Sequence, residues 1–392
     1  MAIVNRIAEF HADMTAWRHE IHAHPETAFE EFRTADFVAK RLGDFGIEVH
    51  RGLAGTGVVG TLKGGNGSQR SIALRADMDA LHIHEKNGFE HVSQNPGKMH
   101  ACGHDGHTTM LLGAARYLAE TRNFDGTVHF IFQPAEENEG GARVMVEQGL
   151  FDQFPVEAVY GMHNMPGYPV GSMCVRNGPL MAAYDVFEIV VRGRGSHGAM
   201  PHQGIDPVVT AAQIITSLQT ISSRNTNPLD SVVVSVTQVH GGDTWNVIPD
   251  EIALRGTTRS FRPEVQKTIE PSIRRIAEGI AQAHGATIAG FRYEMRYPPT
   301  VNTAAETEIA AKAAGTVIGE ANVVRDPVPS MGAEDFAFML QARPGSYVWI
   351  GNGPTEGGCL LHNPHYDFSD EILPIGASYW ATLVEQTLPR RA

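Results

Sequence analysis

One short segment of the chain carries four side chains that could bind a metal ion. It spans residues 99–107, reads Met-His-Ala-Cys-Gly-His-Asp-Gly-His, and supplies the thiol of Cys102 and the imidazoles of His100, His104 and His107. In an extended or tightly looped backbone, residues two apart point to the same side, so Cys102 and His104 can converge on one ion. Thiolate and imidazole are ligands of zinc and related ions. The segment therefore predicts a metal site rather than a buried cysteine beside surface histidines.

Two acidic residues follow an apolar segment further along the chain. Residues 127–132 are apolar and rich in β-formers, Pro134 stops the run, and Glu136 and Glu137 come directly afterwards. Loops just beyond strand ends are where open α/β sheets hold their sites. Adjacent side chains do not point the same way, so one carboxylate can bind metal while the other faces the substrate as a proton carrier. A solvated acidic loop is the alternative that this stretch, taken alone, leaves open.

Two further histidines also stand at the ends of apolar runs. His163 ends the strand-like run over residues 159–163, and His362 follows apolar residues and precedes Pro364. Either histidine alone could have a structural role. The recurrence of histidine, glutamate and cysteine at strand ends in one chain favours a metal site over several separate structural roles.

Ordered motifs run along almost the whole chain. They include Arg-His-Glu-Ile-His at 18–22, Arg-Ala-Asp-Met-Asp-Ala-Leu at 75–81, Cys-Gly-His-Asp-Gly-His at 102–107, Gln-Pro-Ala-Glu-Glu at 133–137, Gly-Ser-His-Gly at 195–198, Gly-Ala-Glu-Asp-Phe at 332–336 and Leu-His-Asn-Pro at 361–364. In this order they resemble the amidohydrolase branch of the dinuclear metallopeptidases. That branch includes aminoacylases, hippurate hydrolases and indole-acetyl-amino-acid hydrolases.

The resemblance implies two divalent metal ions, with zinc expected from the mixed S, N and O ligands and manganese, cobalt or nickel as substitutes. The implied ligands are Cys102, His104, Glu137, His163 and His362. Glu136 matches the general base, which takes a proton from a metal-bound water and passes it to the leaving amine. A divalent ion makes this feasible at neutral pH by lowering the pKa of that water from about 15.7 towards roughly 7. Asp79 matches the acid that orients a ligand, and Asp77 stands where related branches carry a histidine ligand.

Three residues of a later segment complete the implied site. His197 lies in a glycine-rich loop, and the resemblance implies that it reaches across a dimer interface to stabilise the tetrahedral oxyanion, aided by Asn246. A preorganised donor of this kind contributes about 2.7–4 kcal/mol. Arg259 matches the arginine that grips the free carboxylate of the substrate, because a planar guanidinium can hold a carboxylate bidentately. A histidine bonded within its own turn and a surface salt bridge are the respective alternatives for His197 and Arg259.

One stretch departs from the family pattern. Residues 81–85, Leu-His-Ile-His-Glu, replace the proline that usually follows Asp-Ala-Leu. We interpret His82 and His84 as surface residues on a turn rather than as additional ligands. The change could alter the loop near the site, and with it the substrate preference.

The composition excludes several classes of protein. The chain has 392 residues, 42% hydrophobic and 19% charged, which is typical of a globular protein with two domains. Three cysteines are too few for a disulfide scaffold and suit the reducing cytoplasm. Residues 1–10 do not resemble a signal peptide, and no apolar run approaches the roughly 20 residues that cross a membrane. The net charge of −13 disfavours nucleic acid and anionic membranes as partners.

The order of elements predicts one domain inserted into another. Over residues 5–178 helices alternate with strands, which predicts an α/β domain with a mainly parallel sheet. Helices are expected near 3–22, 34–46, 108–121 and 141–149, and strands near 57–63, 71–75, 127–132 and 158–162. From residue 184 the order becomes β-α-β-β-α-β, which indicates a ferredoxin-like α+β layer. We therefore expect a catalytic domain at 1–179 and 298–392, interrupted by a lid and dimerisation domain at 180–297.

These observations predict a metal-dependent amidohydrolase that cleaves N-acyl amino acids, hippurate-like or N-acetyl, to a carboxylate and a free amino acid. The expected assembly is a homodimer or a dimer-based oligomer. A deacetylase of N-acetyl-diaminopimelate, a dipeptidase and a carboxypeptidase are close alternatives. Loss of Glu136 or of two or more ligands would favour a non-enzymatic binding protein, but all are present. A Rossmann dehydrogenase is disfavoured because no Gly-x-Gly-x-x-Gly follows the first strand.

Overall fold

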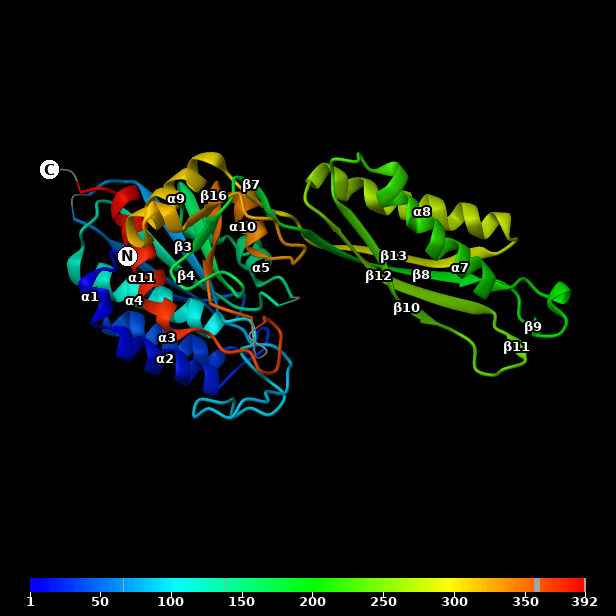
Figure 1. Ribbon diagram of the computed structural model, residues 1–392, viewed down its shortest axis with the longest axis horizontal. Coiled ribbons are helices and arrows are strands. Elements are labelled where there is room, and N and C mark those ends of the chain that lie inside the picture. The colour runs from blue at the N-terminus through cyan, green and yellow to red at the C-terminus, as the bar shows by residue number, and fades with distance from the viewer. Residues whose placement is uncertain (66, 138, 356–359, 391–392) are drawn as a thin grey trace. The chain divides into compact units, whose positions relative to one another are not determined.

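The computed structural model describes residues 1–65, 67–137, 139–355 and 360–390. The chain forms two compact units (Figure 1). The first unit comprises Met1–Gly178, Val301–Val328 and Asp335–Ala392, and the second comprises Pro179–Thr300 and Pro329–Glu334. The expected boundaries placed all of residues 298–392 in the first domain. The structure groups residues 298–300 and Pro329–Glu334 with the second unit, and also Pro179, which was expected to end the first part of the catalytic domain. In the second unit the backbone N–H of Ala182 donates to the carbonyls of Ser330 and Gly332 at 3.1 and 3.0 Å.

The first unit is built on a large mixed sheet whose middle is parallel. Within the described residues its strand order is β1-β2-β4-β3-β5-β16-β6-β15. The strands are β1 (Glu48–Leu53), β2 (Gly57–Lys63), β3 (Ser71–Asp77), β4 (Thr127–Gln133), β5 (Ala158–Met165), β6 (Met173–Val175), β15 (Val323–Arg325) and β16 (Gly345–Gly351). β3 pairs in parallel with β4 and β5, and β16 with β5. These strands are buried along nearly their whole length, as expected for a parallel sheet covered on both faces. The predicted α/β fold with a mainly parallel sheet is confirmed.

Helices cover this sheet and supply much of its core. They are α1 (Asn5–Ala8), α2 (His11–Ala23), α3 (Phe32–Asp44), α4 (His104–Thr121), α5 (Gly141–Glu147), α6 (Leu150–Gln153), α9 (Ala304–Ile318), α10 (Phe336–Ala342) and α11 (Leu373–Thr387). The single helix expected near residues 3–22 is two helices, separated by a turn at Glu9 and Phe10. The helix expected near 108–121 begins four residues earlier, at His104. In the described part of the chain, no helix is both long enough and apolar enough to cross a membrane.

The second unit is a four-stranded antiparallel sheet with two helices on one face (Figure 1). Its strand order is β10-β12-β8-β13, and its chain order is β8 (Ala183–Arg192), α7 (Pro207–Leu218), β10 (Val232–His240), β12 (Glu251–Ser260), α8 (Pro263–Ala283) and β13 (Thr287–Tyr297). β8 alternates strictly between buried and partly exposed residues, because one face packs on the helices. Its inward side chains Phe187, Ile189 and Val191 form a core with residues of α7 and α8. The short strands β9 (Ser196–His197) and β11 (Val247–Ile248) form a separate ribbon.

Candidate metal centre

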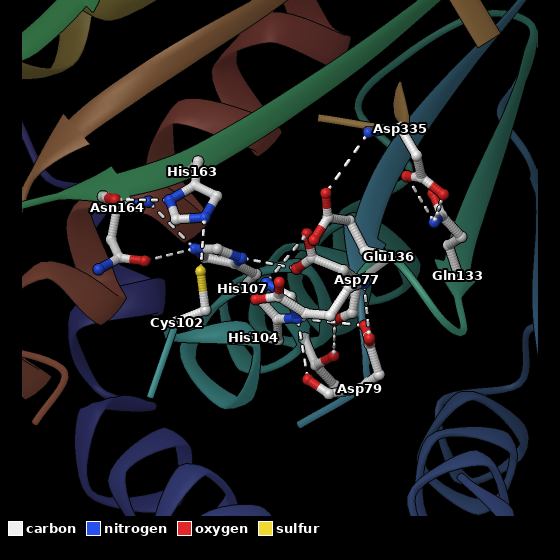
Figure 2. A network of polar contacts seen from close by, with 12 residues as sticks. Asp77, Asp79, Cys102, His104, His107, Gln133, Glu136, His163, Asn164 and Asp335 are labelled. Atoms are coloured by element: carbon white, nitrogen blue, oxygen red, sulfur yellow. Dashed lines mark hydrogen bonds and ion pairs between the residues drawn. The ribbon is translucent and has the colours of Figure 1, made fainter. Parts of the chain in front are cut away.

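The sheet of the first unit brings the acidic and imidazole side chains to one edge (Figure 2). Asp77 is the last residue of β3, Glu136 lies in the loop that follows β4, and His163 lies near the end of β5. These three strands are parallel neighbours, so their carboxyl ends meet at the same edge of the sheet. This is the edge at which open α/β sheets hold their sites.

Cys102 lies in a tight loop, as the sequence suggested, but a helix begins directly after it. His104 is the first residue of α4, and Gly103 precedes it with a φ of 98°. A Cβ atom at position 103 would lie 2.4 Å from Oδ1 of Asn164, so both the conformation and the space require glycine here. The turn still places Sγ of Cys102 3.3 Å from Nε2 of His163.

All five predicted ligands come together, and Glu136 lies among them. Their donor atoms form overlapping groups in which all atoms lie within 4.8 Å of one another: Cys102, His104 and His163; Cys102, Glu137 and His362; His104, Glu136 and Glu137. Nε2 of His104 is buried and has no hydrogen-bond partner among the described residues. A thiol, three imidazoles and two carboxylates with such an unsatisfied nitrogen fit the donor preferences of a divalent transition metal.

Asp79 connects two of these groups. Its Oδ1 lies 3.2 Å from Nδ1 of His104, and its backbone carbonyl lies 2.9 Å from the same nitrogen. Its Oδ2 accepts the backbone N–H of Glu137 at 2.9 Å. Asp79 therefore orients an imidazole on α4 and the loop after β4 at the same time.

A second contact chain, through His107, was not anticipated from the sequence. Nδ1 of His107 lies 2.6 Å from Oδ1 of Asp77, and its Nε2 lies 2.7 Å from Oδ1 of Asn164. The other oxygen of Asp77 lies 3.7 Å from Nε2 of His104. His104 and His107 share one face of α4 because they are three residues apart in a helix. The spacing of three residues would have predicted this shared face if the start of the helix had been expected at His104 rather than near residue 108.

Glu136 is buried, and the residue that precedes α10, Asp335, contacts its carboxylate. Its Oε1 accepts the backbone N–H of Asp335 at 3.4 Å. The Asp335 carboxylate in turn accepts hydrogen bonds from Gln133 Nε2 at 2.8 Å, from the Ala142 N–H at 2.8 Å and from Arg75 at 3.0 Å. Asp335 belongs to the Gly-Ala-Glu-Asp-Phe motif, but no role for this residue was expected from the sequence.

Two loops of the site adopt a left-handed backbone without glycine. Ala135 has a φ of 55° and His362 a φ of 61°. Such residues cost about 1–3 kcal/mol each and persist only where their surroundings enforce them. The Ala135 N–H donates to Glu31 Oε1 at 2.9 Å, and the His362 N–H donates to the Ala101 carbonyl at 2.7 Å. The fold thus fixes the two loops that present Glu136 and His362.

Burial and neighbouring carboxylates dominate the electrostatics of the site. Burial, and then the Glu137 and Glu136 carboxylates, raise the pKa of the Cys102 thiol well above its usual range. Burial opposes the charged form of His104, but the Asp77 and Asp79 carboxylates outweigh it and raise the pKa of this imidazole to about 10. A bound cation would reverse both effects by stabilising the thiolate and the neutral imidazole.

Residues of the N-terminal Arg-His-Glu-Ile-His motif contact the first turn of α4. Nδ1 of His22 lies 2.8 Å from Asp105 Oδ2, and its Nε2 lies 3.2 Å from Glu85. The fully buried Arg18 also reaches Asp105, at 3.3 Å. Asp105 follows His104 directly, so this cluster fixes the first turn of the helix.

The remaining predicted site residues lie in the second unit. His197 is exposed in β9, and its Nδ1 accepts the Ala199 N–H at 3.1 Å. The Gly198 N–H donates to the carbonyl of Asn246 at 2.7 Å, which brings Asn246 beside the His197 loop. Arg259 lies in β12 and stacks on an aromatic ring.

His82, His84 and Cys174 do not belong to these groups. His82 and His84 are exposed, which confirms their interpretation as surface residues. Cys174 is a buried free thiol, and Cys359 lies outside the described residues.

Comparisons with known proteins find relatives that are similar along almost the whole chain. The model of peptidase family M20/M25/M40 matches residues 73–386. The hippurate hydrolase of Campylobacter jejuni is 40% identical over 383 residues, which cover 98% of this chain and 98% of that protein. An N-acetylcysteine deacetylase of Bacillus subtilis is 41% identical over 376 residues, or 95% of this chain and 96% of that protein. A solved Bacillus subtilis structure, described as a dinuclear metal-binding peptidase of family M20, has a TM-score of 0.85 at 38% identity and covers 97% of this chain and 99% of that chain.

Proposed function

The chain belongs to peptidase family M20/M25/M40, and on that basis we propose that it is a metal-dependent amidohydrolase of N-acyl amino acids. The observation that carries the proposal is the convergence of Cys102, His104, Glu137, His163 and His362 around Glu136. The names of two relatives, a hippurate hydrolase and an N-acetylcysteine deacetylase, describe cleavage of an amide between an acyl group and an amino acid. The products would be a carboxylate and a free amino acid.

We propose that the five converging residues hold two divalent ions, since the similar Bacillus subtilis protein is described as a dinuclear metal-binding peptidase. Zinc is the expected metal because the ligands mix sulfur, nitrogen and oxygen, with manganese, cobalt and nickel as substitutes. When bound, such an ion lowers the pKa of a coordinated water from about 15.7 towards roughly 7 and polarises the carbonyl under attack. Cys102 can serve as a ligand only while it is reduced, which favours the cytoplasm as the setting.

Proton transfer and the orientation of the reacting groups are assigned to different residues of the chain. The Glu136 carboxylate accepts a proton from the attacking water and returns it to the nitrogen of the leaving amine. Asp335 supports this role because its backbone N–H fixes one oxygen of Glu136. Asp79 keeps Nδ1 of His104 engaged, so that Nε2 faces the site.

We propose that the second unit is the lid and dimerisation domain of a homodimer and that it contributes groups that contact the substrate. His197 and Asn246 would donate to the oxyanion, and Arg259 would bind the free carboxylate. Two features of the unit support these roles. The His197 side chain is exposed, and the Arg259 guanidinium makes no ion pair with any residue that the structure describes.

A substrate screen tests the proposal. The purified protein is supplied with each candidate metal and assayed for release of amino acid from N-acetyl, N-benzoyl and N-indole-acetyl amino acids. Dipeptides and N-acetyl-diaminopimelate are assayed in parallel. We expect one class of N-acyl amino acid to be cleaved fastest. Faster cleavage of dipeptides or of N-acetyl-diaminopimelate would select the corresponding alternative, and no cleavage with any metal would refute the amidohydrolase assignment.

A further inference from the structure

The face of the second unit's sheet that lies opposite α7 and α8 carries a regular set of cross-strand pairs on β8 and β12. Arg192 lies directly opposite Glu251, and Glu188 lies directly opposite Arg255. In both pairs the arginine forms an ion pair with the glutamate. On this face, therefore, an arginine of either strand is neutralised by the residue across from it.

The next position along the same face breaks the pattern. Arg259 of β12 lies opposite Tyr184 of β8, and its other neighbour, on β10, is Val233. The guanidinium carbon lies 4.2 Å from the centre of the Tyr184 ring. Among the residues that the structure describes, the Arg259 side chain has no hydrogen bond or ion pair.

Tyr184 is itself held in place by a second ring. Tyr297 lies opposite it on β13, and the two rings meet edge to face at 6.2 Å and 87°. Tyr297 is buried, with 5% of its surface exposed. Arg259, Tyr184 and Tyr297 thus form one ladder across three adjacent strands.

Asp185, the acidic residue next to Tyr184, makes no ion pair with Arg259 and influences it only through its charge. Asp185 points to the helix-covered face, because neighbouring residues of a strand alternate. Its carboxylate accepts hydrogen bonds from Tyr293 Oη at 2.7 Å and from Gln266 Nε2 at 2.8 Å. Stacking uses the face of a guanidinium, whereas its N–H groups lie in the plane. Arg259 therefore keeps its donors free for an external planar anion.

We infer that Tyr184 is a specificity-determining positioning residue, which keeps Arg259 free of protein carboxylates and holds its guanidinium flat for the carboxylate of the substrate. This inference rests on the proposed function, in which Arg259 binds that carboxylate. A glutamate at position 184 would reproduce the pairs at 188 and 251 and would neutralise Arg259 from within the sheet.

The test compares two substrates that differ only in the group that Arg259 would bind. Benzoate release is measured from N-benzoylglycine and from N-benzoylglycinamide, with kcat and KM for each. The variants are Tyr184→Phe, Tyr184→Leu, Tyr184→Glu and Arg259→Ala, all in the full chain loaded with metal. Glu188→Gln is the matched control, because it unpairs Arg255 on the same face of the same two strands. The unfolding midpoint of each variant is recorded as a check of folding.

We expect the wild type to prefer the carboxylate substrate and Tyr184→Phe and Glu188→Gln to keep that preference. Tyr184→Leu should raise KM for N-benzoylglycine by about 3- to 30-fold, the range of a cation–π contact, with kcat and the amide substrate little changed. Tyr184→Glu should match Arg259→Ala.

Two results would overturn the inference. If Arg259→Ala loses the preference while Tyr184→Leu and Tyr184→Glu keep it, Tyr184 does not position Arg259, although the proposed function stands. If Arg259→Ala keeps the preference, the role of Arg259 in the proposed function fails, and the role of Tyr184 fails with it.

Discussion

Asp79 holds Nδ1 of His104 with one carboxylate oxygen, at 3.2 Å, and the backbone N–H of Glu137 with the other, at 2.9 Å. An imidazole whose Nδ1 donates in this way presents the lone pair of Nε2, which is the form that binds a metal. The same carboxylate also fixes the loop that carries Glu137. Metal affinity should therefore depend on Asp79 through two of the proposed ligands, His104 and Glu137.

Asp79→Asn is expected to weaken metal binding by about 10- to 100-fold, the usual cost of losing a group that orients a ligand. Competition with a chromogenic chelator measures the affinity directly. Asp36→Asn serves as control, because Asp36 forms an exposed ion pair with Arg51. Equal affinities in the two variants would show that the contact does not orient the ligand.

Glu136 and Glu137 are adjacent, but substitutions of the two residues should have different effects on activity and on metal binding. Glu136→Gln should keep its metal and lower kcat by at least about 10²- to 10⁴-fold, because a general base is lost. Glu137→Ala should instead bind metal poorly, because one of the proposed ligands is lost. Metal content by elemental analysis and kcat for the preferred substrate distinguish the two. The reverse result would exchange the roles of the two residues.

Removal of metal should abolish hydrolysis. Dialysis against a chelator is expected to leave an inactive protein, and added zinc, manganese, cobalt or nickel should restore activity to different degrees. Cys102→Ser should need more metal for recovery, because a hydroxyl is a weaker ligand than a thiolate. Full activity in a preparation shown to be metal-free would contradict the mechanism.

The buried cluster around His22 predicts a dependence of stability on pH. Burial opposes the charged form of His22, but the hydrogen bonds to Asp105 and Glu85 outweigh it and raise its pKa to about 9. Because this pKa lies above the unfolded value of about 6.5, the stabilisation is complete below pH about 6.5 and is lost as the pH rises through about 9. The contribution of this shift to the free energy of unfolding is on the order of 3 kcal/mol.

Unfolding midpoints measured from pH 6 to pH 10 test this prediction. The difference between wild type and His22→Gln should be largest at pH 6 and should narrow towards pH 10. His50→Gln, which changes an exposed histidine, should follow the wild type throughout. A constant difference would mean that His22 is not charged in the folded protein.

If His197 acts in the partner subunit's site, as the family resemblance implies, two inactive variants should complement each other. His197→Ala and Glu136→Gln subunits are mixed under conditions that allow exchange. A mixed dimer would then contain one site with both residues intact, and part of the activity should return. If a native gel shows that mixed dimers have formed but they remain inactive, His197 acts in the site of its own subunit or has no role in catalysis.

The sequence predicted the parts of this site that local pattern controls. The end of β4 at Gln133, with Pro134 beyond it, could be read from an apolar run and its stop, and Glu136 and Glu137 follow directly. The start of α4 could not be read in this way. It depends on Gly103 fitting against Asn164, a contact between residues far apart in the sequence. The contact of His107 with Asp77 was missed for the same reason.

The ladder of Arg259 and Tyr184 shows a second limit. From the sequence alone, Arg259 could either bind a substrate or form a surface salt bridge. That choice depends on which residue of β8 lies opposite it, and strand register is set by the packing of the whole sheet. With Tyr184 there, no salt bridge forms with the described residues.

The order in which the sheet of the first unit is completed has a consequence for synthesis of the protein. β16 begins at Gly345 and pairs with β5 and β6 in the interior of the sheet, yet the whole second unit separates it from them in the chain. Until the ribosome has released β16, the apolar strand β5 keeps an open edge, and such edges recruit other chains. We therefore expect chaperones to bind a nascent chain that pauses before Gly345 is synthesised. His362 emerges later still, so the proposed pair of ions can be loaded only when translation is nearly finished.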